Sequence, residues 1–142
     1  MREWSDRSRE IANLLNPAFC GEILRRAILA YQADFTQGMP FSLIYTVLPT
    51  VMHRKTREMI FDSGRKSMHV WLEEVPQVKI GFGTRVKDFK IFTNEAICFL
   101  SQHSMIDISE NGIITASYTR KSMITNWRDA QNGKKDEYLY LR

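Results

Sequence analysis

The sequence predicts a mainly α protein, a single compact helical domain with a winged helix-turn-helix-like unit and a small β-hairpin wing at about 105–117. Three observations predict this class. Apolar residues recur at helical spacing along much of the chain, residues that favour helix starts precede those stretches, and Asn111-Gly112 separates two short apolar runs, as in a hairpin. The 142 residues suit one domain. We expect 1–142 to form a helical N-terminal part at about 5–75, a winged-helix-like part at about 76–131 and a short C-terminal tail.

Two helices are expected before residue 34, separated by Asn16-Pro17. The residue before a proline avoids the helical region, and proline itself suits the first turn of a helix. The first helix should therefore lie within 5–15, and the second should run from Pro17 to about Ala33. We expect the string from Asn16 to Phe19 to be largely core. On the second helix the predicted solvent-facing residues are charged, namely Glu22, Arg25 and Arg26.

A helix that is apolar on nearly every side is expected at 41–52, after a turn at Gly38-Met39-Pro40. A helix without a polar face is normally central, so this one should be largely core. Pro49 should kink or end it, because proline removes a backbone hydrogen bond. A basic segment at 53–57 follows, in which Thr56-Arg57 should make a charged contact, internal or with a partner. A short amphipathic helix at about 66–74 comes next.

The second half of the chain has the element order of a winged helix-turn-helix unit. Residues 78–82 alternate in polarity, so that strand and helix both remain open there. Thr84 and Thr93 can each cap a helix. Asn111-Gly112 supplies the positive φ angles of a two-residue hairpin turn, which makes a wing. One more helix is expected at about 122–131.

No catalytic constellation is visible in the sequence. With 44% hydrophobic and 25% charged residues, the chain has the composition of a soluble globular protein. His53, His69 and His103 lack metal-ligand spacing, and no nucleophile-elbow, phosphate-loop or zinc-protease motif occurs. We therefore expect no enzymatic activity, no metal and no cofactor. Cys20 and Cys98 are expected to be buried thiols in a cytoplasmic protein. No stretch is apolar enough to predict a membrane span.

Basic residues form three groups, in a chain with 20 Lys and Arg against 16 Asp and Glu. The second predicted helix of the winged unit carries no Lys or Arg, and the wing tip is acidic, so that sequence-specific DNA reading is disfavoured and a protein-binding scaffold is favoured. Non-specific phosphate contact stays open. The candidate partner or phosphate contacts are Arg54, Lys55 and Arg57 in the first group, Arg85, Lys87 and Lys90 in the second, and Arg120, Lys121 and Arg128 in the third.

Several segments together resemble a known family. They are 14–21 (LLNPAFCG), 38–49 (GMPFSLIYTVLP), 52–57 (MHRKTR), and Trp71-Leu72 followed by Phe82 and Arg85. Taken together they resemble the middle component of three-component ABC conflict systems, which overlap Lamassu antiphage defence. The resemblance extends from about residue 4 to the end. It implies a small non-catalytic adaptor subunit that bridges an SMC-like ABC ATPase and an effector such as a nuclease, with DNA contacted through the complex.

A winged-helix DNA-binding transcriptional regulator is the alternative function. Such a regulator should bind duplex DNA by itself, with sequence preference, at physiological salt. An adaptor should bind DNA weakly with a steep salt dependence, or not at all.

Overall fold

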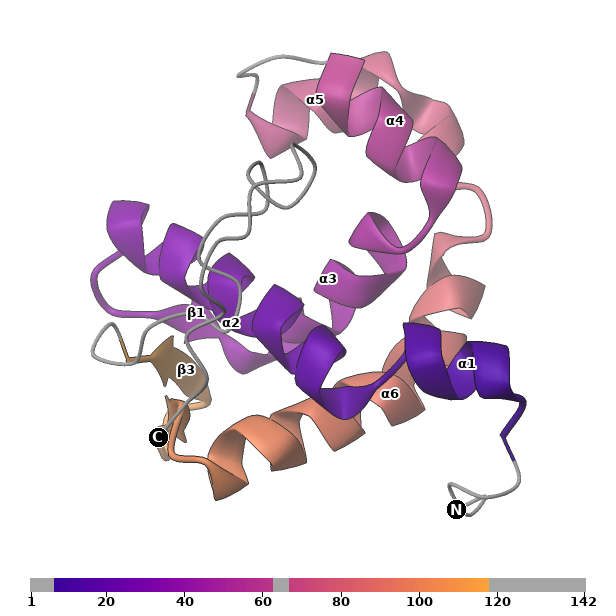
Figure 1. Cartoon of the computed structure of the whole chain (residues 1–142). Coiled ribbons are helices and arrows are strands. Elements are labelled where there is room, and N and C mark those ends of the chain that lie inside the picture. The colour runs from indigo at the N-terminus through magenta and orange to yellow at the C-terminus, as the bar shows by residue number, and fades with distance from the viewer. Residues whose placement is uncertain (1–6, 63–66, 118–142) are drawn as a thin grey trace, which may run out of the picture.

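A computed structural model describes residues 7–62 and 67–117. Its helices are α1 (Arg9–Leu14), α2 (Pro17–Asp34), α3 (Ile44–Val51), α4 (Arg54–Asp62), α5 (Met68–Glu74) and α6 (Phe82–Gln102), with short 3-10 helices η2 (Phe41–Leu43) and η3 (Pro76–Lys79). The strands are β1 (Met39–Pro40), β2 (Ile106–Ile108) and β3 (Ile113–Ala116). The mainly α class with a small hairpin is confirmed (Figure 1). The helix expected at 122–131 and the tail lie outside the described residues.

Helix α2 begins at Pro17, as predicted. The Asn16 side chain caps it by accepting a hydrogen bond of 2.8 Å from the Ala18 backbone N–H. The prediction of which α2 residues are buried and which are exposed is partly wrong, however. Asn16 and Phe19 are exposed, whereas Glu22 and Arg25 are buried. The reason is that both α6 and β3 pack against α2, so that more of its circumference is covered than an amphipathic pattern implies.

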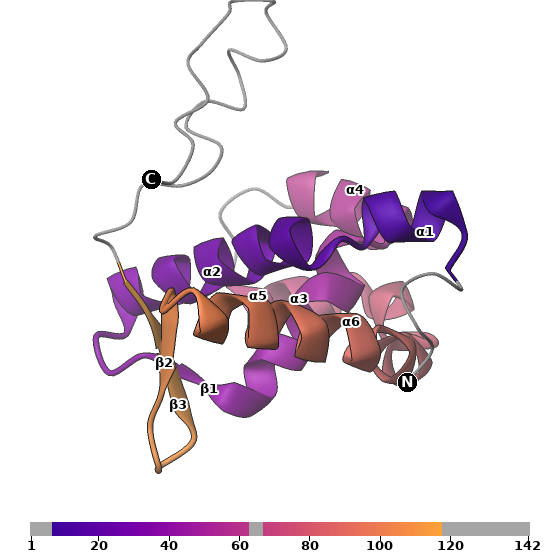
Figure 2. The same cartoon turned by 60° about the horizontal axis from the view of Figure 1, so that its bottom comes forward.

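The core lies where α2, α3 and α6 meet. Helices α2 and α6 run side by side, with α3 packed against both (Figures 1 and 2). Gly21 permits this close approach, since a Cβ there would lie 3.3 Å from the Leu100 side chain. Each of these helices contributes fully or nearly fully buried apolar side chains, and β3 adds one more: Cys20, Leu24, Ile28, Ile44, Leu48, Ala96, Ile97, Leu100 and Ile114.

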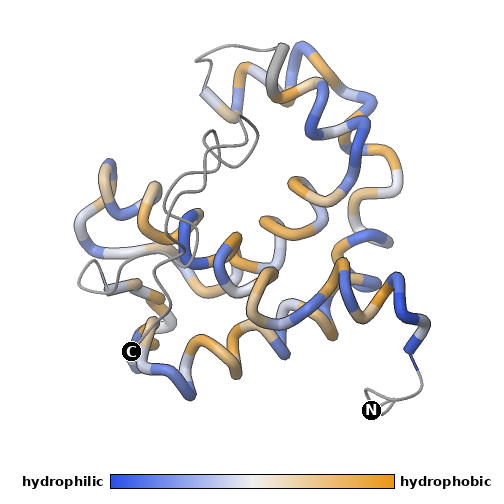
Figure 3. The backbone as a smooth tube through the Cα atoms, in the orientation of Figure 1, coloured by the Kyte–Doolittle hydropathy of each residue, from blue (hydrophilic) through white to orange (hydrophobic). Residues whose placement is uncertain are grey.

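The apolar stretch 41–52 is only partly core. It begins as η2, continues as α3, and ends at Val51, two residues after Pro49. Ile44, Leu48 and Pro49 are buried, but Leu43 is 40% exposed. In Figure 3 α3 is orange to white, whereas α4 begins in blue. The expectation that 41–52 is largely core is therefore wrong for one face of α3, which borders a groove.

Residues 82–102 form one continuous helix, α6, so the pair of helices expected at 84 and 93 is not formed. Thr93 is buried in the middle of the helix, and its hydroxyl donates to the Phe89 carbonyl at 3.1 Å instead of capping a new helix. The ambiguous segment before α6 is the 3-10 helix η3. Gly81, with φ of 66°, then turns the chain into α6. The hairpin therefore follows one long helix and not a helix-turn-helix.

The three strands form an antiparallel sheet in the order β1-β3-β2. The wing at 105–117 is where the sequence predicts it, with Ile108 opposite Ile114. Its turn differs from the prediction: Gly112 has φ of 70° but Asn111 does not adopt positive φ, and the Ser109 N–H donates to the Ile113 carbonyl at 2.9 Å. These features define a hairpin with a three-residue loop, in which Gly112 forms a bulge. The extra strand β1 pairs with β3 directly after the predicted turn at Gly38.

Candidate functional site

The described residues do not assemble a metal-binding cluster. Across 7–62 and 67–117, no three His, Cys, Asp or Glu side chains gather in a way that would hold a metal ion. His53 precedes α4, His69 lies in α5 and His103 follows α6. These three imidazoles occupy different elements, so the fold gives them no shared chemistry.

The two cysteines have different environments. Cys20 is fully buried, and burial, followed by the negative charge of Glu95, raises the pKa of its thiol to about 11. It therefore remains a protonated, unreactive thiol at neutral pH. Cys98 is exposed on the outer face of α6, so its predicted burial is wrong. The helical stripe of α6 turns Ala96 and Ile97 inward and leaves the next residue in solvent.

The segment His53–Arg57 organises the start of α4. The His53 Nδ1 accepts from the Thr56 backbone N–H at 3.3 Å and lies 2.7 Å from the Thr56 hydroxyl, which is buried. Burial, with positive charge from Arg85 and Lys55, lowers the pKa of His53. The neutral imidazole is the form that can accept at Nδ1 and cap the helix. This part of the motif that resembles the family is therefore a local folding device.

The first group of predicted contact residues is divided between internal and solvent-facing roles. The Arg57 guanidinium donates to the Val51 carbonyl at 2.8 Å, which is an internal contact at the end of α3. Arg54 pairs with Glu58 one turn along α4, at 2.7 Å. Lys55 is exposed. Within this group, Lys55 is the side chain best placed to meet an external anion.

The second group is divided in the same way. Arg85 donates to the Val78 and Ile80 carbonyls, each at 2.9 Å, and lies over the Phe82 ring, so it fixes the joint between η3 and α6. Lys87 and Lys90 are exposed and lie one turn apart on α6. The third group, Arg120, Lys121 and Arg128, lies outside the described residues.

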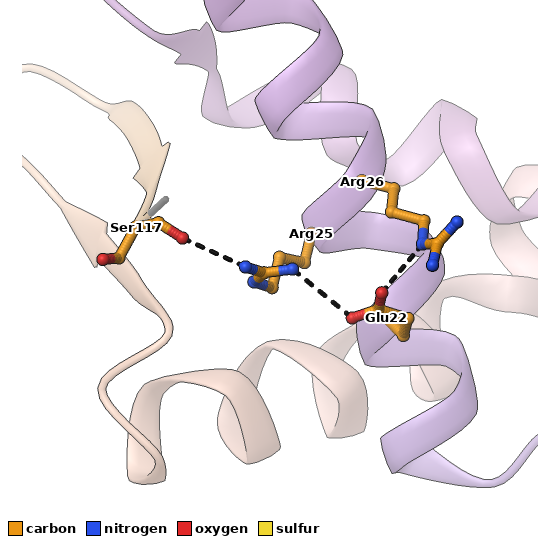
Figure 4. A network of polar contacts seen from close by, with 4 residues as sticks. All are labelled: Glu22, Arg25, Arg26 and Ser117. Carbon is orange, nitrogen blue, oxygen red and sulfur yellow. Dashed lines mark hydrogen bonds and ion pairs between the residues drawn. The ribbon is translucent and has the colours of Figure 1, made fainter. Parts of the chain in front are cut away.

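A buried ion-pair network joins α2 to the end of β3 (Figure 4). The Glu22 carboxylate lies between two arginines, at 2.8 Å from Arg26 and 3.6 Å from Arg25. Arg25 also donates to the Ser117 carbonyl at 3.1 Å. Because Glu22 and Arg25 are both buried, losing one partner would leave an uncompensated charge in the protein interior. The network therefore holds the hairpin against the helical core.

The described surface contains an apolar groove with a volume of about 770 Å³. We call it the α3–α5 groove, after the two helices in its walls; both are labelled in Figure 1. Its described lining residues come from α2, β1, η2, α3, α5, η3 and the start of α6: Tyr31, Met39, Leu43, Thr46, Val47, Thr50, Val51, Met68, Trp71, Leu72, Val78, Lys79, Phe82 and Gly83.

This groove is mostly apolar, and its outer edge is exposed. Leu43 on one wall and Met68 on the other are 40% and 60% exposed, whereas Trp71 is buried and donates to the Met59 carbonyl at 3.3 Å. The groove was not predicted from the sequence, because 41–52 was expected to be largely core. The spacing of Leu43, Val47 and Thr50 is the signal that marks this face of the helix.

The described part of the chain contains no helix that combines the length and the apolar character required to cross a bilayer. Fold and site thus define a small helical protein with an apolar groove. The family model of the ABC-three component (ABC-3C) system Middle Component 3 matches residues 4–135, and the chain belongs to this family. It is an accessory component of a multi-component system, which agrees with the family resemblance of the sequence. Neither the curated proteins nor the solved structures contain a match to it.

Proposed function

We propose that this chain is a non-catalytic adaptor that bridges an SMC-like ABC ATPase and an effector, such as a nuclease, in a Lamassu-type antiviral system in the cytoplasm. The observation that carries the proposal is the match to the middle-component family over residues 4–135. An apolar groove supports the proposal, as do Arg57 and Arg85, which bind backbone carbonyls within the chain. An adaptor needs surfaces for partners more than a reactive centre.

DNA contact, in this proposal, occurs through the assembled complex. We propose that Lys55, Lys87 and Lys90 supply the subunit's own contacts to phosphate or to an acidic partner, because their ammonium groups face solvent. Such contacts are non-specific and weaken steeply with salt. The transcriptional-regulator alternative depended on a pair of helices at 84 and 93. Because α6 is continuous, we do not propose this alternative.

Co-expression tests the adaptor function directly. The tagged chain would be produced together with the other components of its own system, purified through the tag, and weighed by native mass spectrometry. We expect an assembly that contains the ATPase and the effector at fixed ratios. Recovery of the chain alone, as a monomer or a dimer, would contradict the proposal.

A further inference from the structure

The α3–α5 groove is elongated along a helix. Its lining residues on one wall recur at Leu43, Thr46-Val47 and Thr50-Val51, about two turns from the end of η2 along α3. At 1.5 Å per residue this wall is about 12 Å long. The opposite wall presents Met68 and Leu72, which also lie one turn apart. Two mostly apolar walls with side chains at helical spacing match a helix that lays one apolar face between them.

The described lining of the groove carries positive charge. Among the described lining residues Lys79 is the single charged side chain. The carboxylate of Glu73 on α5 pairs with His69 and is not part of the described lining. A mostly apolar groove whose described lining carries a lysine is complementary to an amphipathic helix that carries a carboxylate beside its apolar face.

This charge disfavours one occupant from the chain itself. The segment 118–142 has six Lys and Arg against three Asp and Glu, so it would bring positive charge to Lys79. An acidic helix from a different protein does not meet this objection.

We infer that the α3–α5 groove docks an acidic amphipathic helix of another component of the system. This inference rests on the proposed adaptor function and specifies its docking surface. Apolar side chains of that helix would fill the space between Leu43 and Met68, and its carboxylates would meet Lys79. These two apolar side chains are exposed in the isolated chain, and the partner helix would bury them.

Matched substitutions in the full chain, co-expressed with the other components, test the inference. Leu43→Glu and Met68→Glu place a carboxylate on each wall of the groove, and Lys79→Glu reverses its charge. The controls are Leu14→Glu, at an apolar residue on α1 that is 60% exposed, and Arg9→Glu, also on α1. Affinity for the purified partner component would be measured by biolayer interferometry, and thermal unfolding of each variant would show that it folds.

We expect each groove substitution to weaken binding about 10-fold or more, while the two controls retain the wild-type affinity. The effect of Lys79→Glu should decrease at high salt, because exposed charges are screened. If all groove variants bind as tightly as the wild type, the inference is wrong although the adaptor function stands. If the wild-type chain binds no component, the adaptor function itself fails.

Two further results would assign the groove to another occupant and overturn the inference. One is a wild-type dimer in light scattering that Leu43→Glu converts to a monomer, which would identify a second copy. The other is faster hydrogen exchange of α3 in the isolated Trp127→Glu variant, which would identify the chain's own C-terminal segment.

Discussion

Replacing Gly38 by alanine tests how closely the turn before β1 packs against β3. Gly38 has φ of 99°, and a Cβ there would lie 2.7 Å from the Thr115 Cγ2 and 2.8 Å from both the Ile113 Cγ2 and the Ile114 carbonyl oxygen. Positive φ costs an L-residue about 1–2 kcal/mol, and displacing packed neighbours costs about 1–3 kcal/mol more. We expect a loss of about 2–5 kcal/mol in the free energy of unfolding. For a chain of this length that lowers Tm by about 6–15 °C.

Two other glycines separate the contributions to that loss. Gly112 has φ of 70° but open space around its Cβ position, so Gly112→Ala should cost only the backbone contribution of about 1–2 kcal/mol. Gly83 has neither positive φ nor a neighbour within 4 Å and lies within α6, so Gly83→Ala should stabilise by about 0.5–1 kcal/mol. Thermal and urea unfolding followed by circular dichroism would rank the three. If Gly38→Ala costs no more than Gly112→Ala, the close approach of β1 and β3 is refuted.

Three further predictions concern the core and the titratable groups. Leu48→Ala should lower the free energy of unfolding by about 2–4 kcal/mol in urea titrations, because Leu48 is fully buried; a loss below 1 kcal/mol would contradict its place in the core. A maleimide should label Cys98 alone in the folded protein and both thiols in denaturant, since Cys20 is buried; labelling of both in the native state would contradict this. Folding lowers the pKa of His53, so the unfolded chain binds more protons between that pKa and the ordinary value of about 6.5. Wild-type stability should therefore fall as pH drops below about 6.5, and His53→Asn should reduce that fall; equal pH dependence of the two proteins in urea titrations would refute the cap.

Local signals in the sequence predict the starts and turns of the fold well. Asn16-Pro17 places the break between α1 and α2, and Gly112 places the hairpin, because a proline and a positive-φ glycine act through their own backbone geometry. Thr93, in contrast, led to the wrong prediction of a helix start. Its hydroxyl satisfies a carbonyl of the preceding turn equally well inside a helix, so a capping residue does not by itself end one.

Features that depend on tertiary packing could not be predicted from the same patterns. The burial of Glu22 and Arg25 follows from where the end of β3 lies, which places the Ser117 carbonyl within reach of α2 across 92 residues of sequence. The exposed face of α3 is a similar case. Its apolar composition predicts a core helix, but α5 leaves one side uncovered. Hydropathy measures how strongly a side chain prefers burial, whereas the choice between core and docking surface depends on the neighbouring elements.

The positions of the cations connect the fold to the proposed assembly. Arg25, Arg57 and Arg85 each donate to a backbone carbonyl of another segment, so the fold uses their planar guanidinium groups as internal ties. Lys79 and Lys87 are instead exposed, and Lys79 lines the α3–α5 groove. An exposed lysine has a flexible, strongly hydrated ammonium group that contributes little to the stability of its own chain. The same group can form an ion pair with a carboxylate of a bound partner. Substitution of those arginines should therefore reduce stability first, whereas substitution of Lys79 should reduce assembly while leaving the Tm of the free subunit unchanged.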